Sequence, residues 1–377
     1  MIVAAREAGR YPPWSLVRRD VIIKEKHERP PKRGAEDKVT GSTTSSHKAW
    51  ADLLGPYAQP SVGRSIFQLL NSAVPLVVLW ILMLASIEYS YWITLLLAVP
   101  AAGFLVRLFI IQHDCGHGSF FRSRTANNTL GFVLGIATLT PYAYWRKTHA
   151  IHHATSANLD HRGLGDIKTL TVKEYFALTP WKRFRYRLYR NPLILFVLGP
   201  LWEFVLRHRF PLGTPRSWRR EWASVLWTNL AILAVVVTMW KTIGIPAFLA
   251  VQLPLTLLAG TAGVWLFYIQ HQFEDTYWEH DDAWSFHAAG LEGSSYYDLP
   301  GILHWFTGNI GVHHVHHLSS RIPNYRLRQC LRENPELQQV TRLTLWESVK
   351  CARLKLWDEE RRKLVGLPRL GSIRAKS

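Results

Sequence analysis

Histidines form the most informative pattern in this sequence. The chain has 377 residues, of which 17 are histidine. Most of the clustered histidines lie in HxxxH or HxxHH patterns. One further histidine lies just after a long apolar stretch. These histidines are His113 and His117; His149, His152 and His153; His313, His314, His316 and His317; and His271. Imidazole is a ligand that suits Fe, Zn, Cu and Ni.

The spacing of the clusters predicts a shared ligand pocket. On a helix, residues at i, i+3 and i+4 lie on one face with their Cβ atoms a few ångströms apart. HxxxH and HxxHH therefore direct two or three imidazoles toward one point. Spacing alone does not separate His314 from His316, because either shares a face with His313 and His317. The matching form of the second cluster favours His316.

Nine imidazoles are too many for one metal ion. They suit two ions with four or five nitrogen ligands each. A zinc hydrolase usually needs three protein ligands and a water molecule, so this number favours a redox-active pair. The clusters lack the carboxylates of the soluble Glu-x-x-His di-iron bundles. A bis-histidine haem protein would place single histidines within facing spans, which is not the pattern here.

Five other histidines stand singly between the clusters or near them. A single buried histidine is usually a hydrogen-bonded core residue. We therefore expect a core role, without metal, for His161, His208, His280, His287 and His304.

Long apolar stretches place the clusters at a membrane surface. Four of them reach the roughly 20 residues that span a bilayer, at 69–87, 91–111, 223–241 and 247–269. They form two hairpins, and His113 and His271 lie just past the second and fourth stretches. Two shorter apolar stretches, at 129–144 and 192–206, are predicted to be interfacial or partly embedded helices.

Positive charge predicts the orientation of these spans. The formal net charge is +18, and almost all Lys and Arg lie before, between or after the hairpins. Only Lys241 lies at the far side, so both termini and the active site are predicted to be cytoplasmic. No nucleic-acid-binding motif is present, so we expect no nucleic-acid partner. Arg107, within a span, is expected to snorkel to the interface or to contact a lipid phosphate or redox partner.

Composition limits the remaining alternatives. The sequence is 48% hydrophobic, which excludes global disorder. Its three cysteines, Cys115, Cys330 and Cys351, form no CxxC pair, which fits a reducing compartment. The spans offer almost no ionisable path, which disfavours a membrane metal transporter. We predict a flexible polar tail at 1–45, a membrane domain at 46–365 and a C-terminal tail at 366–377.

The sequence resembles the membrane fatty acid desaturases, specifically the omega-6 (delta-12) acyl-lipid type. The matching strings are HDCGHGSFF at 113–121, WRKTHAIHH at 145–153, QHQFEDTYW at 270–278 and GNIGVHHVHHLSSRIPNY at 308–325. The resemblance covers about residues 45–350. It implies an all-α integral membrane fold with four transmembrane helices in two hairpins. It also implies a cytoplasmic helical cap that carries a histidine-rich di-iron site.

The resemblance further implies two iron ions, with O₂ as co-substrate and electrons from an external donor such as a ferredoxin or cytochrome b5. The implied ligands are His113, His117, His149, His152, His153, His271, His313, His316 and His317. In such sites an asparagine near the fourth-span histidine contacts the second metal through water. Phe267 occupies that position here, so Asn309 is the candidate replacement, with a helix cap as its alternative role.

Carboxylates are expected to orient the imidazoles by accepting their other N–H, unless they are solvated or capping groups. The candidates are Asp114, Asp160, Asp166, Glu274 and Asp275. Aromatic residues near the clusters are candidates for the walls of an acyl tunnel or for an interfacial belt. They are Tyr142, Tyr144, Trp145, Trp305 and Phe306.

The expected reaction introduces a cis double bond into a long acyl chain carried by a lipid or a thioester. An unactivated C–H bond resists acid–base chemistry, so O₂ activated at a metal is required. A fatty acyl hydroxylase or a carotenoid ketolase or hydroxylase on the same scaffold is the alternative, since these enzymes share such histidine boxes. The boxes encode neither the chain length nor the bond position.

Overall fold

The computed structural model describes residues 49–367. Its main feature is a set of four long helices: α2 (Val62–Ser86), α3 (Tyr91–His117), α8 (Arg219–Thr242) and α9 (Ile245–His271). Each is long and apolar enough to cross a membrane, which confirms the four predicted spans. The predicted tail at 1–45 lies outside the described residues. So does the predicted tail at 366–377, apart from its first two residues.

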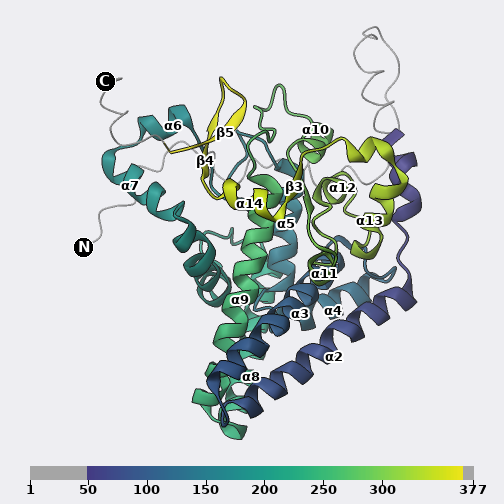
Figure 1. The fold of residues 1–377 in the computed structure, drawn as a ribbon, viewed down its shortest axis with the longest axis vertical. Helices are drawn as coiled ribbons and strands as arrows, with labels where there is room; N and C mark the ends of the chain where they lie inside the picture. Colours follow the sequence, from purple (N-terminus) through teal and green to yellow (C-terminus); the bar gives the residue numbers. More distant parts are fainter. Residues whose placement is uncertain (1–48, 368–377) are drawn as a thin grey trace.

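The long helices form two hairpins that share an interface. α2 packs against α3, α8 against α9, and α3 also packs against α9 (Figure 1). Gly244, between α8 and α9, has φ +80°, a conformation that glycine adopts without a Cβ penalty. The hairpins therefore bring the C-terminal ends of α3 and α9 to the same end of the bundle.

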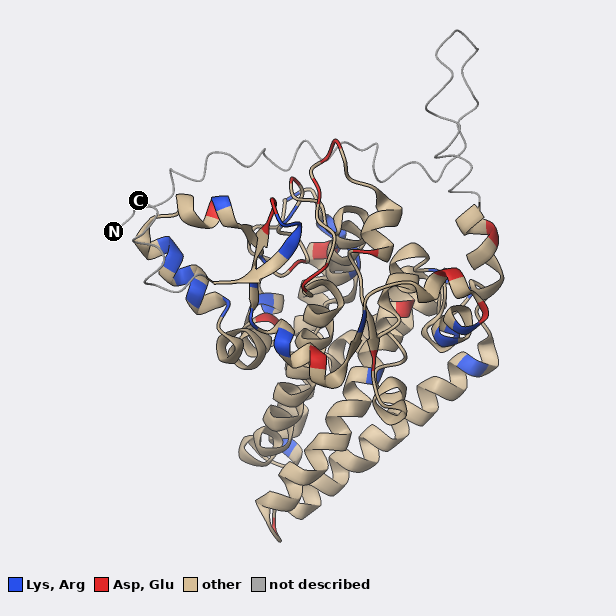
Figure 2. Ribbon diagram, turned by 45° about the horizontal axis from the view of Figure 1, so that its top comes forward, with Lys and Arg blue, Asp and Glu red and all other residues tan. Residues whose placement is uncertain are grey.

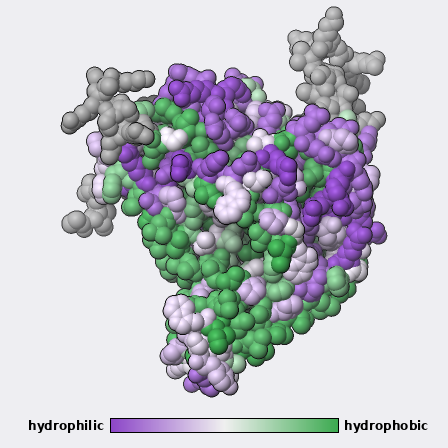
Figure 3. All heavy atoms as spheres, in the orientation of Figure 1, coloured by the Kyte–Doolittle hydropathy of each residue, from purple (hydrophilic) through white to green (hydrophobic). Residues whose placement is uncertain are grey.

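Apolar side chains cover the outward faces of the long helices. Phe67 and Leu96 are 70% and 72% exposed. Figure 3 shows an apolar surface over the lower part of the molecule and a hydrophilic surface above it. An apolar surface of this extent is unfavourable in water and favourable in lipid. The chain is accordingly a multi-pass membrane protein.

Basic residues gather on the polar cap. In Figure 2, Lys and Arg lie mainly on the cap elements and are nearly absent from the four long helices. The exception within a span is Arg107, which faces inward. Its Nε donates to Ser72 Oγ at 3.0 Å, its Nη1 donates to the Trp305 carbonyl, and its guanidinium stacks 4.0 Å from the centre of the Trp305 ring. Neither predicted role for Arg107 is therefore correct, because it joins α2, α3 and α11 (Gly301–Phe306).

The predicted helix at 129–144 is broken in the structure. α4 (Arg124–Ala137) begins at an N-cap, where the Ser123 hydroxyl accepts from the Ala126 N–H, and α5 begins only at Tyr142 (Tyr142–Thr155). Leu139 has φ +54°, which ends the α4 conformation. The apolar run thus belongs to two helices and a turn, a difference that hydrophobicity alone does not reveal.

The predicted helix at 192–206 adopts an unusual helical form. It contains two π-helical segments, η4 (Ile194–Leu198) and η5 (Leu201–Leu206), followed by a short 3-10 turn, η6 (Arg207–Arg209). η5 lies close against α9, since a Cβ added at Gly260 would be 2.9 Å from the Pro200 Cβ. π-helical turns often occur at functional sites.

Short helices build most of the cap above the membrane helices. They are η3 (Gly55–Tyr57), α6 (Val172–Ala177), α7 (Pro180–Tyr189), α10 (Phe286–Leu291), α12 (His313–Leu318), α13 (Asn324–Glu333), η7 (Pro335–Gln338) and α14 (Leu345–Cys351). The predominantly helical fold is confirmed, and Cys115, Cys330 and Cys351 are free and buried.

The cap also contains two small sheets that the prediction of an all-α fold omitted. β1 (Leu170–Thr171) runs parallel to β4 (Leu354–Asp358), which pairs antiparallel with β5 (Lys363–Gly366). β2 (Tyr296–Asp298) runs parallel to β3 (Arg342–Thr344). Strands of two to five residues are too short to leave a readable alternation in the sequence.

A buried arginine fixes the first sheet to the membrane helices. The Arg190 Nη2 donates to the Gln272 Oε1 and the Leu354 carbonyl, each at 2.9 Å, and to the Tyr268 hydroxyl at 3.3 Å. Its Nη1 donates to the Lys168 carbonyl at 3.1 Å. A buried guanidinium is unfavourable unless it is hydrogen-bonded, and these bonds from both terminal nitrogens hold the cap on the end of α9.

Candidate metal centre

Four helices bring the clustered histidines together. α3 runs through the first cluster and ends at Gly118 with φ +69°, so His113 and His117 share one helical face. α5 carries the second cluster, His271 is the last residue of α9, and α12 carries the third cluster. The clusters are therefore helical, as their spacing predicts.

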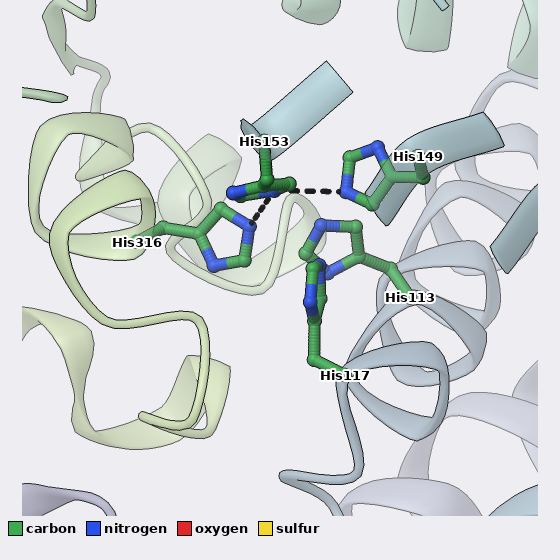
Figure 4. A group of neighbouring side chains, drawn as sticks. All are labelled: His113, His117, His149, His153 and His316. Atoms are coloured by element: carbon green, nitrogen blue, oxygen red, sulfur yellow. Dashed lines mark hydrogen bonds between the residues drawn. The ribbon is translucent and has the colours of Figure 1, made fainter. Parts of the chain in front are cut away.

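The first group contains five imidazoles, shown in Figure 4. They belong to His113, His117, His149, His153 and His316, and one nitrogen of each lies within 4.8 Å of those of the others. The Nε2 atom of His153 lies 3.1 Å from those of His149 and His316. The five rings thus converge on one point between α3, α5 and α12.

The second group contains four imidazoles, those of His152, His271, His313 and His317, again with nitrogens within 4.8 Å. The Nε2 atom of His271 lies 3.1 Å from that of His152 and 3.0 Å from that of His313. The nine predicted histidines divide between the two groups. His152 and His153 are neighbours in sequence, yet they face different groups.

The nine rings are suited to hold cations. Burial lowers the pKa values of His149, His153, His313, His316 and His317 well below the usual value, so these rings are neutral. Neutral rings offer a nitrogen lone pair. Within the described residues, the Nε2 atoms of His117 and His317 are buried without a hydrogen-bond partner. Converging lone pairs repel one another unless a cation lies between them, so the arrangement fits two bound metal ions.

His314 lies outside both groups. Its Nε2 is 3.0 Å from the Leu337 carbonyl, and its ring is fully buried. The structure therefore separates the two residues that spacing left equivalent, and His316 is the one that faces the other imidazoles. His314 instead connects α12 to η7.

Two of the predicted carboxylates contact one of the nine imidazoles. Asp166 Oδ1 lies 2.6 Å from His152 Nδ1, which directs the His152 Nε2 toward the second group. Asp114 Oδ1 lies 3.4 Å from His113 Nδ1, a longer contact. Asp114 Oδ2 accepts from the Asn324 backbone N–H at 2.7 Å and from its side-chain amide at 2.8 Å. Asp114 thus ties α3 to α13.

The other predicted carboxylates hydrogen-bond elsewhere. Asp160 accepts from the Asp281 N–H at 3.0 Å and pairs with His280 at 2.9 Å. Glu274 and Asp275 are exposed and pair with Lys363. Asn309 has φ +59° at the end of α11, and its amide donates to the Asn324 carbonyl at 3.4 Å. None of these four side chains hydrogen-bonds to the nine imidazoles within residues 49–367.

Other orienting groups were missed from the sequence. The Gly293 carbonyl lies 3.0 Å from His271 Nδ1, and backbone carbonyls leave no sequence signal. Gln68 Nε2 donates to Asn324 Oδ1 at 2.7 Å, which supports the Asp114 contact from α2. These residues are separated by more than 200 positions, so only an alignment of related sequences could have linked them.

The single histidines fall into two kinds. His208 and His304 are buried, as expected. His161 and His280 are about half exposed and pair with Asp281 and Asp160, so the expectation of a core role was wrong for them. Their neighbourhood is rich in carboxylates, which favours a surface position. The ring of His287 stacks on that of Trp50 with centroids 6.3 Å apart.

A cavity of about 690 Å³ lies beside the two groups. His113, His149 and His313 form part of its wall, and most of the remaining wall is apolar. Of the predicted tunnel residues, Tyr144 and Trp145 line the cavity.

The other three predicted tunnel residues pack elsewhere. The Tyr142 hydroxyl donates to the Cys115 carbonyl at 2.7 Å. Trp305 stacks with Arg107, and Phe306 lies against Gly103. All three therefore join helices rather than form the cavity wall.

The fold and the site define a class of integral membrane oxidoreductase, with histidines at the ends of membrane helices beside an apolar cavity. Residues 90–348 match the sequence profile of the fatty acid desaturase family. The chain belongs to this family, whose members are oxidoreductases that act on fatty acids with O₂.

Several named proteins are similar to this chain. The chain is 48% identical over 309 residues to a fatty acid desaturase of Bacillus subtilis (strain 168), covering 82% of this chain and 87% of the relative. It is 32% identical to an sn-1 acyl-lipid omega-3 desaturase (ferredoxin) of Synechocystis sp., covering 59% and 62%. It is 27% identical to an sn-1 oleoyl-lipid 12-desaturase of Anabaena variabilis, covering 64% and 69%.

The two adjacent histidines of α12 provide a matched test of the site. His316→Ala removes one of five converging ligands and should lower bound metal by about half, since the second group retains its four ligands. His314→Ala removes the contacts of this ring with the Leu337 carbonyl and the Tyr296 ring, so it should lower thermal stability and leave metal content unchanged. Metal per chain is measured by mass spectrometry of the purified protein. Equal metal loss in both variants would contradict the assignment.

The contact between Asp166 and His152 provides a second test. Asp166→Asn weakens the group that orients His152, so metal affinity should fall about 10- to 100-fold. Asp160→Asn is the matched control, because Asp160 contacts His280 instead. Competition with a chelator measures both affinities. A larger effect in the control than in Asp166→Asn would show that the Asp166 contact does not support the metal centre.

Proposed function

We propose that this protein is a di-iron fatty acid desaturase that introduces a cis double bond into a long acyl chain of a membrane lipid. The observation that carries the proposal is the contact between two groups of imidazoles and one apolar cavity. The proposed ligands are the five histidines of the first group and the four of the second. Bound iron would supply the O₂ activation that removal of hydrogen from an unactivated methylene requires.

The side chains of the cavity perform the binding and positioning. An apolar wall favours an acyl chain and excludes water from the reacting carbons. His113, His149 and His313 are part of that wall, so a bound chain contacts the ligands themselves. Phe267, where the resemblance leads one to expect an asparagine, also lines the cavity. Its ring centre lies 5.1 Å from that of His152.

The proposed position of the new bond is delta-12, which is omega-6 in an eighteen-carbon chain. The 27% identical relative named as a 12-desaturase supports this position. A 32% identical relative is named as an omega-3 desaturase, so omega-3 is the main alternative position for the new bond. The location of the double bond in the product decides between them.

The proposed electron donor is a separate small protein, a ferredoxin or a cytochrome b5. The free, buried cysteines of the described chain form no iron–sulfur pattern, and one relative is named with ferredoxin. The basic residues of the cap suit an acidic partner. By the excess of Lys and Arg, the cap and both termini are proposed to be cytoplasmic.

Expression in a host with simple lipids tests the function. The wild-type chain, with an adequate electron donor, should yield acyl chains that have lost two hydrogens, and His316→Ala should yield almost none. Mass spectrometry of the lipids detects the product and locates the bond. A product that has gained an oxygen would indicate a hydroxylase instead. Unchanged lipids with the metal-loaded wild-type chain would contradict the proposal.

Two glycines of α9 test whether the cavity holds the acyl chain. A Cβ at Gly263 would meet no atom within 4 Å, and Gly263 lines the cavity. Gly263→Leu should therefore fill the cavity without loss of metal. Product formation should fall about 10- to 100-fold, which is the size of effect expected for overpacking.

Gly260→Leu is the control for that substitution. It makes the same change three residues away, where a Cβ would lie 2.9 Å from the Pro200 Cβ. It should reduce folded protein, because η5 must move. Full product formation by a well-folded Gly263→Leu variant would show that the chain binds elsewhere.

A further inference from the structure

One part of the cavity wall carries polar side chains that the metal centre does not use. We call it the polar wall, and it consists of Tyr144, Glu203, Arg207 and His208. Arg207 Nη1 donates to both Glu203 oxygens, at 2.8 and 2.9 Å. His208 Nε2 lies 3.5 Å from Glu203 Oε1, and the Tyr144 and His208 ring centres are 6.3 Å apart. The polar wall is thus one connected cluster from α5, η5 and η6.

Two side chains of the polar wall have hydrogen-bonding capacity left over. Within the described residues Arg207 donates only through Nη1, so its Nε and Nη2 remain for a ligand. His208 is 5% exposed, and its Nδ1 is buried without a hydrogen-bond partner of good geometry, although the Leu139 carbonyl lies near the ring. The nearby Leu139 carbonyl accepts from Arg209. A buried polar group without a partner is uncommon, and a bound ligand can supply one.

The surroundings of the polar wall indicate where such a ligand comes from. Trp202, Leu206 and Phe210 flank Arg207 in sequence and are 58%, 48% and 59% exposed. Large exposed apolar residues beside a membrane bundle contact lipid. Leu105 and Ala259, elsewhere in the same cavity, are apolar. A ligand that suits both parts has a polar end and a long apolar chain, and it arrives from the bilayer.

We propose that Arg207 and His208 bind the ester end of a lipid-borne acyl chain and that the position of the new double bond is counted from this end. The inference rests on the proposed function. It extends that function to the lipid that carries the acyl chain and to the chain end from which the bond position is counted. Arg207 has free N–H groups to donate to an ester carbonyl, and Glu203 holds its guanidinium in place. The apolar remainder of the cavity then receives the chain as it passes the imidazoles.

The end of the acyl chain that the protein binds decides from which end the position of the double bond is counted. Methylenes are chemically alike, so only a fixed contact at one end can select a carbon. An anchor at the ester holds the same carbon number from the carboxyl end beside the metal in every chain. An anchor at the methyl end would instead hold the same number from the opposite end.

A chain-length series in membranes of a host that expresses the full-length protein tests this way of counting. The host is supplied with acyl precursors of sixteen, seventeen and eighteen carbons, and double bonds are located by mass spectrometry. The double bond should keep one position counted from the carboxyl end in all three chains. A constant position counted from the methyl end would overturn the inference and leave the proposed function standing. A wild-type chain that forms no double bond would overturn both.

A substitution tests the residue assignment. Arg207→Gln should lower product per enzyme about tenfold or more, the size of a lost hydrogen bond from a charged donor. It should also spread the double bond over several positions, which a merely structural role would not do. Arg216→Gln is the matched control, because Arg216 is exposed and lies outside the cavity wall. Unchanged amount and position of product in Arg207→Gln would overturn the assignment.

Discussion

The convergence of nine imidazoles, six of them buried, is the constraint on which the rest of the structure depends. Burial lowers the pKa of rings such as those of His153 and His316, and it makes an unpaired nitrogen unfavourable unless a cation or a hydrogen bond satisfies it. The rings come from four helices, so those helices must meet at one depth. The Asp166 carboxylate, the Gly293 carbonyl and the contact between Asp114 and Asn324 hold them there.

Local patterns made the main elements predictable. Apolar length identified α2, α3, α8 and α9, and helical spacing identified the faces that carry His113, His149 and His313. The division of nine rings into five and four was not predictable. Adjacent residues on a helix point about 100° apart, so His152 and His153 serve different groups. Which group each one faces depends on where α9 and α12 lie.

Long-range contacts account for what sequence reasoning missed. Gln68 and Asn324 support Asp114, although Asn324 lies more than 200 positions from each of the other two in the chain. The sequence around each residue therefore does not predict these contacts. Proximity in sequence also misled, since Glu274 and Asp275 follow His271 closely yet pair with Lys363 on the surface. Proximity to the clusters was also an incomplete guide for the aromatic residues. Tyr144 lines the cavity, whereas Trp305 stacks with Arg107.

The sheet made by β1, β4 and β5 has a consequence for how the protein is made. β1, close after Asp166 in the chain, pairs with β4 alone among the strands of residues 49–367, and Arg190 bonds to the Leu354 carbonyl of that strand. β4 and β5 follow both membrane hairpins in the chain, so a ribosome releases them after the hairpins. Until then the segment that carries Asp166 lacks its final support, although both membrane hairpins have already been inserted. Assembly of the histidine centre is therefore completed only after β4 has been synthesised, and nascent chains interrupted before β4 leave the centre unfinished.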